Sequence, residues 1–234
     1  MLDAGCGNGR FSEFMSQSGK LSSYTGIDFS AGLLAQAAEN YSHLPEPVRF
    51  EQVDLRQPGF LSEFGTYDLI THHAVLHHIP QKSRRQAIIN ELAAHLKKDG
   101  MLMLSTWQFA TNERQKRKIT DWNNVGLTPN DVESGDYLLT WNRAGFGYRY
   151  CCMIDAAQTA ELAENAGLTI VKQYLEDGKE RDLSPIHFAD TRLISSEIAF
   201  VLACKRIKEL LNSTPTAGVF GRMTPKWRCF NGNS

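Results

Sequence analysis

Apolar residues along the chain recur with two alternating spacings, one typical of buried strands and the other of helices with one apolar face. Short apolar runs predict strands at residues 24–28, 48–54, 67–76 and 101–106. Between them, apolar residues at helical spacing predict helices, and one of these covers residues 81–97. Because strands and helices alternate through short connections, the pattern predicts a parallel sheet with right-handed crossovers.

The later part of the chain adds one helix and two strands. Asp155 is expected to cap a helix that runs through Ala166, and strands follow at residues 168–175 and 196–204. These two strands are expected to form an antiparallel hairpin at the sheet edge. The predicted fold is therefore an α/β, Rossmann-like, doubly wound sheet of seven strands, mostly parallel with an antiparallel last strand.

Two stretches depart from the alternation. Residues 108–150 are rich in Asn, Arg and Trp and interrupt the sheet, so we expect a lid or a substrate-binding insertion there. Residues 207–234 hold Thr, Pro, Gly and Asn without a clear period and are expected to form an irregular C-terminal tail. The main domain is accordingly assigned to residues 1–206.

The first strand is expected to be truncated. Only Met1 and Leu2 precede the acidic residue Asp3, where a central strand needs about five residues. A chain that starts so close to its first turn is also expected to lack an N-terminal helix.

Composition narrows the class of protein. The 234 residues, 42% of them hydrophobic, suffice for one substantial core. The sequence has no run of about 20 apolar residues and no leading basic and apolar segment, so a cytoplasmic protein without a membrane span is expected. Five cysteines without a C-x-x-C pair are expected to stay reduced. A net charge of -1 gives no overall attraction to nucleic acid.

Candidate chemistry begins at the first turn, which reads Asp3-Ala4-Gly5-Cys6-Gly7-Asn8-Gly9. Glycines at such a turn let backbone N–H groups approach a ligand closely, and a helix N-terminus follows them. The G-x-G-x-G spacing differs from the dinucleotide fingerprint, and the absence of a following Lys-Ser/Thr argues against triphosphate binding. We therefore assign this turn, with Asp3, Gly5, Gly7 and Gly9, to a nucleotide-cofactor loop.

Two further carboxylates end predicted strands. Asp28 lies about 20 residues past the loop glycines, where parallel folds place an acceptor for ribose hydroxyls. Its alternative role is to help Ser30 cap the next helix. Asp54 ends the third strand and suits an exocyclic amine such as adenine N6, although a plain surface turn is the simpler interpretation.

Histidines cluster on the fourth strand and just beyond it. His72 and His73 alternate between opposite faces, so at most one of them faces a ligand. Neither histidine pair resembles a metal set, and no metal is predicted. His77 and His78 follow the carboxyl end of the strand, where α/β folds bind ligands, but they are equally able to pack the following turn.

Aromatic and basic residues of the insertion are the remaining candidates. Trp107 and Trp141 either stack on a base or fill the core of the insertion. Arg114 begins a basic cluster that extends to Lys118 and is either a substrate contact or a solvated helix face.

The motifs in combination resemble the class I S-adenosylmethionine (SAM) dependent methyltransferases. The segments are D-A-G-C-G-N-G, G-I-D-F-S, V-D-L, Y-D-L-I-T-H-H-A-V-L-H-H-I and D-G-M-L-M-L-S. The resemblance implies SAM as cofactor, with the loop from Asp3 to Gly9 on its methionine part. It also implies that Asp28 binds the ribose and that Asp54, with Leu55 beside it, meets the adenine. The implied sheet order is 3-2-1-4-5-7-6 with strand seven antiparallel.

Later segments resemble, more loosely, the tRNA methyltransferases that form a methyl ester on the carboxymethyl group of wobble uridine. These segments are L-H-H-I, Ser105-Thr106-Trp107, Tyr148-Arg149-Tyr150 and Gly178-Lys179-Glu180-Arg181-Asp182. This resemblance implies a tRNA substrate and a small activating protein subunit. A carboxylate acceptor is already ionised at neutral pH and needs orienting donors, for which His77, His78 and Arg181 are the catalytic candidates.

Two other functions stay open on the sequence. One is O- or N-methylation of a small molecule, with residues 108–150 closing an apolar pocket. The other is a non-catalytic cofactor-binding subunit or an inactive fragment. A basic surface around residues 114–118 would favour RNA, whereas an enclosed cavity without a basic rim would favour a metabolite.

Overall fold

The computed structural model describes residues 1–234 except residues 20, 46, 112, 143–144, 177–197 and 206–234. The predicted C-terminal tail and the catalytic candidate Arg181 lie outside the described residues.

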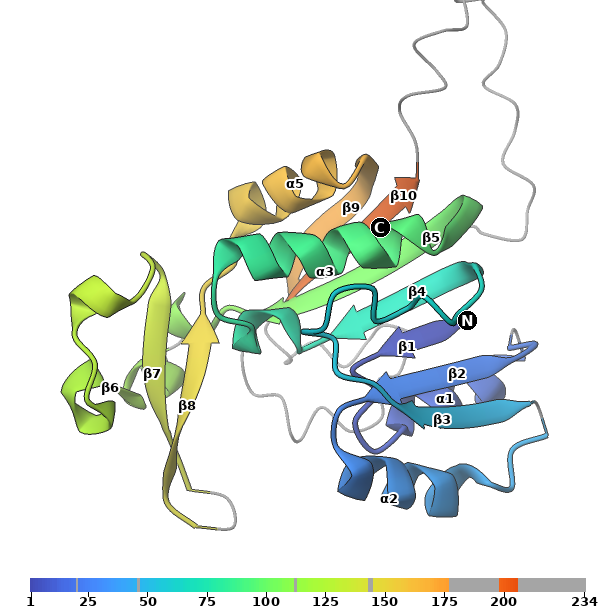
Figure 1. The fold of residues 1–234 in the computed structure, drawn as a ribbon, viewed down its shortest axis with the longest axis horizontal. Coiled ribbons are helices and arrows are strands. Elements are labelled where there is room, and N and C mark those ends of the chain that lie inside the picture. Colours follow the sequence, from blue (N-terminus) through green and yellow to red (C-terminus); the bar gives the residue numbers. More distant parts are fainter. Residues whose placement is uncertain (20, 46, 112, 143–144, 177–197, 206–234) are drawn as a thin grey trace, which may run out of the picture.

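A seven-stranded sheet forms the body of the molecule, in the order β3-β2-β1-β4-β5-β10-β9 (Figure 1). Its strands are β1 (Leu2–Ala4), β2 (Tyr24–Asp28), β3 (Val48–Gln52), β4 (Tyr67–His73), β5 (Leu96–Trp107), β9 (Leu168–Glu176) and β10 (Ile198–Lys205). The pairs among β1 to β5 are parallel, whereas β10 runs antiparallel to both β5 and β9. The prediction of a Rossmann-like α/β fold with a mostly parallel central sheet is confirmed.

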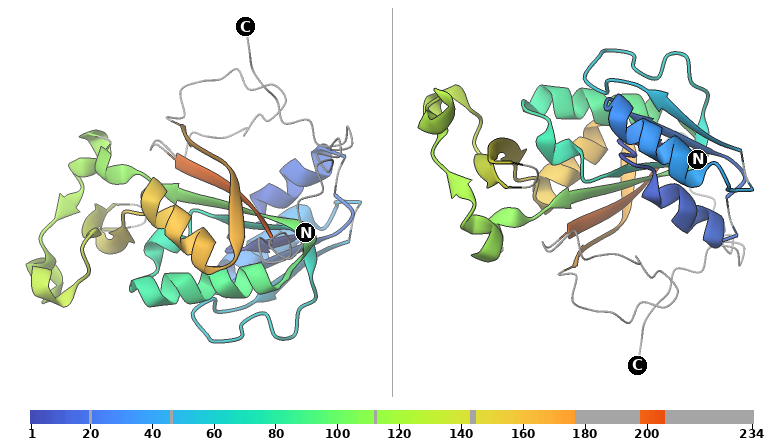
Figure 2. Two further views of the ribbon diagram at one scale, coloured as in Figure 1. Left: turned by 90° about the horizontal axis from the view of Figure 1, so that it is seen from above. Right: turned by 90° about the horizontal axis from the view of Figure 1, so that it is seen from below.

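Helices cover both faces of this sheet. They are α1 (Arg10–Gln17), α2 (Ala31–Tyr41), α3 (Lys82–Ala94) and α5 (Ala156–Asn165). Figures 1 and 2 show α3 and α5 side by side on one face and α1 on the opposite face, while α2 packs against β2 and β3. The α5 helix begins at the predicted cap, since Asp155 accepts a hydrogen bond from the Gln158 N–H at 2.8 Å.

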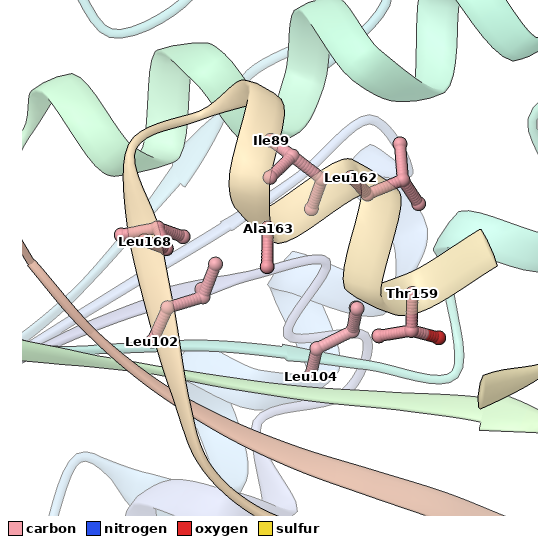
Figure 3. A pocket seen from close by; sticks show the side chains of 7 residues that line it. All are labelled: Ile89, Leu102, Leu104, Thr159, Leu162, Ala163 and Leu168. Carbon is pink, nitrogen blue, oxygen red and sulfur yellow. The ribbon is translucent and has the colours of Figure 1, made fainter. Parts of the chain in front are cut away.

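The largest apolar cluster lies between the sheet and the α3–α5 layer. Figure 3 shows a small hollow in this layer, and its lining is almost wholly apolar: Ile89, Leu102, Leu104, Thr159, Leu162, Ala163 and Leu168. The one hydroxyl of this lining, on Thr159, donates to the Asp155 carbonyl at 2.7 Å. The hollow is therefore part of the hydrophobic core and offers no polar chemistry.

The stretch between residues 108 and 150 carries a second, three-stranded antiparallel sheet. It consists of β6 (Ile119–Thr120), β7 (Asp136–Trp141) and β8 (Gly147–Cys152), with short helices η2 (Phe109–Thr111), α4 (Glu113–Lys116), η3 (Trp122–Val125) and η4 (Pro129–Asp131). Figure 1 shows this small sheet beyond the carboxyl ends of β4 and β5. The sequence pattern predicted the interruption but not the strands within it, because these short strands are defined by pairing with one another.

Element boundaries differ from the prediction most clearly at the end of β4 and at the junction of α3 with β5. Strand β4 ends at His73 instead of residue 76, because Ala74 adopts a left-handed conformation with φ 56° and a single turn, η1 (Leu76–His78), follows. Helix α3 ends at Ala94, and Leu96 already belongs to β5. The lysines after Leu96 resemble a helix C-terminus, but pairing of β5 with β4 extends the strand instead. Among the described helices, none is long and apolar enough to cross a membrane.

Candidate functional site

The glycine loop leaves β1 at the edge of the sheet where the parallel strands end. The N–H groups of Gly5 and Cys6 both donate to the Ile27 carbonyl of β2, at 2.7 and 3.0 Å. Gly5, Gly7 and Gly9 have φ values of 86°, 55° and 79°. Such left-handed conformations are strained for residues with a side chain, which explains the alternating glycines.

The three glycines differ in what surrounds them. A Cβ on Gly5 would lie 2.3 Å from Val75 Cγ2, and one on Gly9 would lie 2.9 Å from Ala37 and Phe50. A Cβ on Gly7 would meet nothing within 4 Å among the described atoms. Glycine at positions 5 and 9 is thus favoured by packing as well as by backbone conformation, whereas Gly7 faces open space.

Asp28 links the loop to the helix that follows β2. Its Oδ2 accepts the Gly7 N–H and its Oδ1 accepts the Ser30 N–H, both at 2.9 Å. The side chain thus takes part in the local turn, which was the alternative role predicted for it. Each carboxylate oxygen has a second lone pair, so the same group can also accept from a ligand hydroxyl.

Asp3 lies beneath the loop and is 3% exposed. Its two oxygens accept the hydroxyls of Tyr24 at 2.5 Å and Thr71 at 2.8 Å. Burial raises the pKa of Asp3 to about 6, and these hydrogen bonds partly oppose the rise. The structure therefore holds the Asp3 side chain between β2 and β4, directly before the glycine loop.

Asp54 follows β3, which ends at Gln52 and not at Asp54 as predicted, and it forms an ion pair with Arg56. The Arg56 side chain donates to both carboxylate oxygens at 2.8 Å, and this lowers the pKa of Asp54 to about 2. Its neighbour Leu55 is buried in the main core. Because β3 pairs with β2, the strand that ends in Asp28, the Asp54–Arg56 ion pair lies at the same edge of the sheet as Asp28.

On β4, His72 is buried and His73 is partly buried, and the two side chains point to opposite sides. His72 donates from Nδ1 to the Ala4 carbonyl at 2.7 Å, just before the glycine loop. The His73 ring packs edge-on against Phe11 of α1, with 5.2 Å between ring centroids. Burial lowers the pKa of both rings to about 4, so they are uncharged at neutral pH.

His77 and His78 belong to η1 and pack against Trp107 at the end of β5. The His77 ring lies 4.7 Å from Trp107, and His77 Nδ1 accepts the Trp107 backbone N–H at 3.4 Å. Because Nδ1 is the acceptor, the proton of neutral His77 is assigned to Nε2. Among the described residues, neither His77 Nε2 nor Trp107 Nε1 has a hydrogen-bond partner, and both atoms are buried.

His78 turns its Nδ1 toward β8. This atom lies 3.1 Å from the Tyr150 carbonyl and 3.4 Å from Cys151 Sγ. Burial, with a smaller contribution from the charge of Arg149, lowers the pKa of His78 to about 4. Burial also lowers the pKa of His77. The two rings are therefore uncharged and only weakly basic.

Arg149 of β8 lies beside these aromatic rings, and the sequence prediction did not single it out. Its guanidinium carbon lies 3.6 Å from the ring centroid of Trp141 and 5.9 Å from that of Trp107. The structure thus brings the two predicted tryptophans to one cation, although 34 positions of sequence separate them. Arg114 is exposed on α4. The useful signal in the sequence was the Tyr148-Arg149-Tyr150 segment.

Known proteins resemble this chain in sequence and in fold. Residues 1–100 match the family model described as a methyltransferase domain. A putative methyltransferase of Encephalitozoon cuniculi is 28% identical over 179 residues, which are 76% of this chain and 73% of that protein. The trans-aconitate 2-methyltransferase of Deinococcus radiodurans is 33% identical over 167 residues, covering 71% of this chain and 57% of the relative.

Coverage is lower for another group of relatives, the ubiquinone biosynthesis O-methyltransferases. The protein from Glaesserella parasuis is 32% identical over 109 residues, and these are 45% of this chain and 44% of the relative. In fold, the chain is similar to a SAM-dependent methyltransferase from Methanosarcina mazei, with a TM-score of 0.66, 18% identity, and coverage of 88% of this chain and 91% of the other. The match over residues 1–100 shows a methyltransferase domain in this chain, and its Rossmann-like fold is similar to that of SAM-dependent methyltransferases.

Proposed function

We propose that this methyltransferase transfers a methyl group to an oxygen of an ionised carboxylate and so forms a methyl ester. The observation that carries this proposal is the pair of buried N–H donors, His77 Nε2 and Trp107 Nε1, which lack an acceptor among the described residues. Leaving a buried donor unpaired costs about 1 to 3 kcal/mol, a cost that a bound acceptor oxygen removes. Donors orient an anion, and an anion needs no base.

The glycine loop and the strand ends are the proposed cofactor site. The loop from Gly5 to Gly9 would hold the methionine part, Asp28 the ribose, and Asp54 with Leu55 the adenine, with Asp3 supporting the loop from below. When bound, SAM supplies a methyl group on a positively charged sulfur, which keeps the bonding electron pair when an acceptor oxygen takes the methyl. The protein's main contribution is then alignment of the acceptor with that methyl group.

The histidines of η1 fit an acceptor that arrives already ionised. With its Nδ1 bonded to the Trp107 N–H, His77 presents an N–H and not a lone pair. The pKa of His78, lowered to about 4, makes its imidazole a poor general base at neutral pH. A carboxylate requires no proton removal, so weak bases suffice.

A small carboxylic acid is the substrate class that we favour. Support comes from the relative named for trans-aconitate, a small polycarboxylate, which aligns with 71% of this chain. The ubiquinone biosynthesis relatives are named as O-methyltransferases. Both names fit an oxygen acceptor.

A second candidate substrate is a carboxymethyl group on the wobble uridine of tRNA, in the cytoplasm and with a small activating subunit. The observation that favours it is the exposure of basic and aromatic side chains on the insertion. Arg114 and Arg117 are exposed there, and Phe146 and Tyr148 form an exposed aromatic pair with ring centroids 5.2 Å apart. Basic and aromatic side chains together suit single-stranded nucleic acid.

Methyl transfer from SAM labelled in its methyl group tests this function. The full chain is incubated separately with trans-aconitate and with bulk tRNA. The tRNA is first treated with mild alkali, which hydrolyses existing methyl esters to free carboxylates. The expected product releases labelled methanol on a second alkaline treatment, which is the signature of an ester. Label that resists alkali, as in an ether or a methylamine, would contradict the ester assignment.

Variants of the exposed arginines separate the two substrates. If tRNA is the acceptor, Arg114→Ala with Arg117→Ala should reduce transfer to tRNA and make it less sensitive to salt, since phosphate contacts release counterions. Transfer to trans-aconitate should not respond to the same pair of substitutions.

The ribose assignment of Asp28 gives a separate prediction. We expect Asp28→Ala to weaken SAM binding by more than about 1 kcal/mol, because a charge-assisted hydrogen bond is lost. Calorimetric titration with SAM measures this, and Asp28→Asn, which keeps one oxygen acceptor for the Gly7 or Ser30 N–H, separates the loss of charge from damage to the turn. Asp68→Ala is the control, because Asp68 lies near the start of β4, away from the carboxyl ends of the strands. An affinity unchanged by Asp28→Ala would refute the assignment.

A further inference from the structure

The register of the small sheet places Arg149 on its inner face. In β7 and β8, Leu139 is paired with Arg149 and Tyr137 with Cys151, so these side chains share one side of the sheet. Leu139 and Cys151 are buried there with Phe109, and Trp107 packs against this cluster. Arg149 is thus a cation at the border of an apolar surface that abuts the end of β5.

Two indole rings hold the guanidinium in this place. Its carbon lies 3.6 Å from the centroid of Trp141 and 5.9 Å from that of Trp107. A cation over an aromatic face is attracted by the ring quadrupole, more strongly where water is excluded. Stacking engages the flat face of a guanidinium, whereas a carboxylate is bound at its edge by two parallel N–H donors, so both contacts can be made together.

A second arginine, Arg85 of α3, lies beside the same strand. It is 6% exposed, and its guanidinium donates to the Ile79 carbonyl at 2.9 Å and to the Tyr150 hydroxyl at 3.3 Å, and pairs with Glu133 at 3.0 Å. These contacts join β8 to the start of α3 on the side of the small sheet that faces away from Trp107. The guanidinium groups of Arg85 and Arg149 therefore lie against opposite faces of β8. Arg85 links the insertion to α3, whereas Arg149 borders the aromatic cluster.

Arg149 also lies close to the proposed acceptor donors. Trp107 contacts His77, His78 and the Arg149 guanidinium, so one indole touches every group of this cluster. The position lies at the carboxyl ends of β4 and β5, where ligands of open α/β sheets bind. A cation and two N–H donors on one aromatic cluster match the charge and the lone pairs of a carboxylate.

We propose that Arg149 is the specificity residue that binds the carboxylate of the acceptor, with Trp141 and Trp107 orienting its guanidinium. This inference rests on the proposed function and names the residue that recognises the substrate class. It adds a substrate contact from the insertion to the histidines and tryptophan at the strand ends. The insertion is then part of the acceptor site and not only a cover for it.

Binding of a carboxylate probe to the full chain tests the proposal without relying on turnover. Trans-aconitate and alkali-treated bulk tRNA are titrated while tryptophan fluorescence is recorded, since Trp141 and Trp107 flank the guanidinium. Arg149→Gln is expected to raise the Kd of the probe that binds wild-type protein by about 10- to 100-fold. Arg149→Lys keeps the charge but loses the planar fork of the guanidinium, so its Kd for the probe is expected to lie between those of the wild type and Arg149→Gln.

The matched control is Arg84→Gln, which removes the same charge from an exposed position of α3. It should leave probe binding unchanged, and all variants should bind SAM like the wild type by calorimetry. Arg149→Gln that binds the probe as tightly as wild type, or wild-type protein that binds neither probe, would overturn the assignment. The ester assay and this titration can fail separately. An alkali-stable methyl product would contradict ester formation, but the comparison of probe binding between wild type and Arg149→Gln would still be interpretable.

Discussion

Gly5→Ala is expected to lower the free energy of unfolding by about 3 kcal/mol, the sum of a left-handed backbone penalty and an overpacking penalty. The backbone penalty follows from a φ of 86° at Gly5. The overpacking penalty follows from Val75 Cγ2, which lies 2.3 Å from the position of the new Cβ. Val75 belongs to the turn between β4 and η1, so it cannot move aside without shifting the histidines. Urea denaturation followed by circular dichroism measures the change.

Gly7→Ala is the matched comparison in the same loop. Its φ of 55° carries a similar backbone penalty, but the new Cβ meets nothing within 4 Å among the described atoms. We expect it to cost about 1 to 2 kcal/mol of stability. The space over Gly7 is the proposed cofactor site, so this variant should lose SAM affinity while staying folded. Equal stability losses at Gly5 and Gly7 would show that Val75 does not confine the loop.

Acidification from pH 7 to pH 4 is expected to destabilise the domain by several kcal/mol. Burial lowers the pKa of His72 to about 4, whereas the unfolded chain takes up that proton near pH 6.5. Stability from this ring is therefore complete above about pH 6.5 and is lost as the pH falls toward 4, by about 3 kcal/mol in order of magnitude. His73, His77 and His78 act in the same direction, because burial lowers the pKa of each.

Asp3 acts in the opposite direction. Burial raises its pKa to about 6, so its contribution to stability is present at low pH and is lost as the pH rises through 6. One carboxyl offsets only part of the effect of four imidazoles, so stability should still fall on acidification.

Urea titrations at several pH values between 7 and 4 check the acid prediction. His72→Asn keeps a side-chain N–H for the Ala4 carbonyl but removes the titrating ring, so the dependence of stability on pH should become shallower by about one proton. His43→Asn, at an exposed position, is the control. Stability that stays flat between pH 7 and pH 4 would contradict the burial of these rings.

Local patterns in the sequence determined much of the fold. The alternation of strands and helices predicted the central sheet, because side-chain period reports backbone conformation directly. The glycine loop was equally visible, since positive φ values at Gly5, Gly7 and Gly9 are a local demand of the turn. The strands of the small sheet were missed because short strands become stable only through partners that lie elsewhere in the chain.

Only the tertiary structure decided which side chains meet. It paired the Asp3 carboxylate with the hydroxyls of Tyr24 and Thr71. It also placed Val75 next to Gly5, and it brought the Arg149 guanidinium close to both Trp107 and Trp141. Periodicity along a chain reveals which face a residue occupies, but not which residue of another element lies opposite. That choice depends on the register between β7 and β8 and on the packing of the insertion against β5, which join residues far apart in sequence. The sequence by itself therefore determined the fold and the glycine loop, whereas the proposed acceptor site exists only through packing between distant elements.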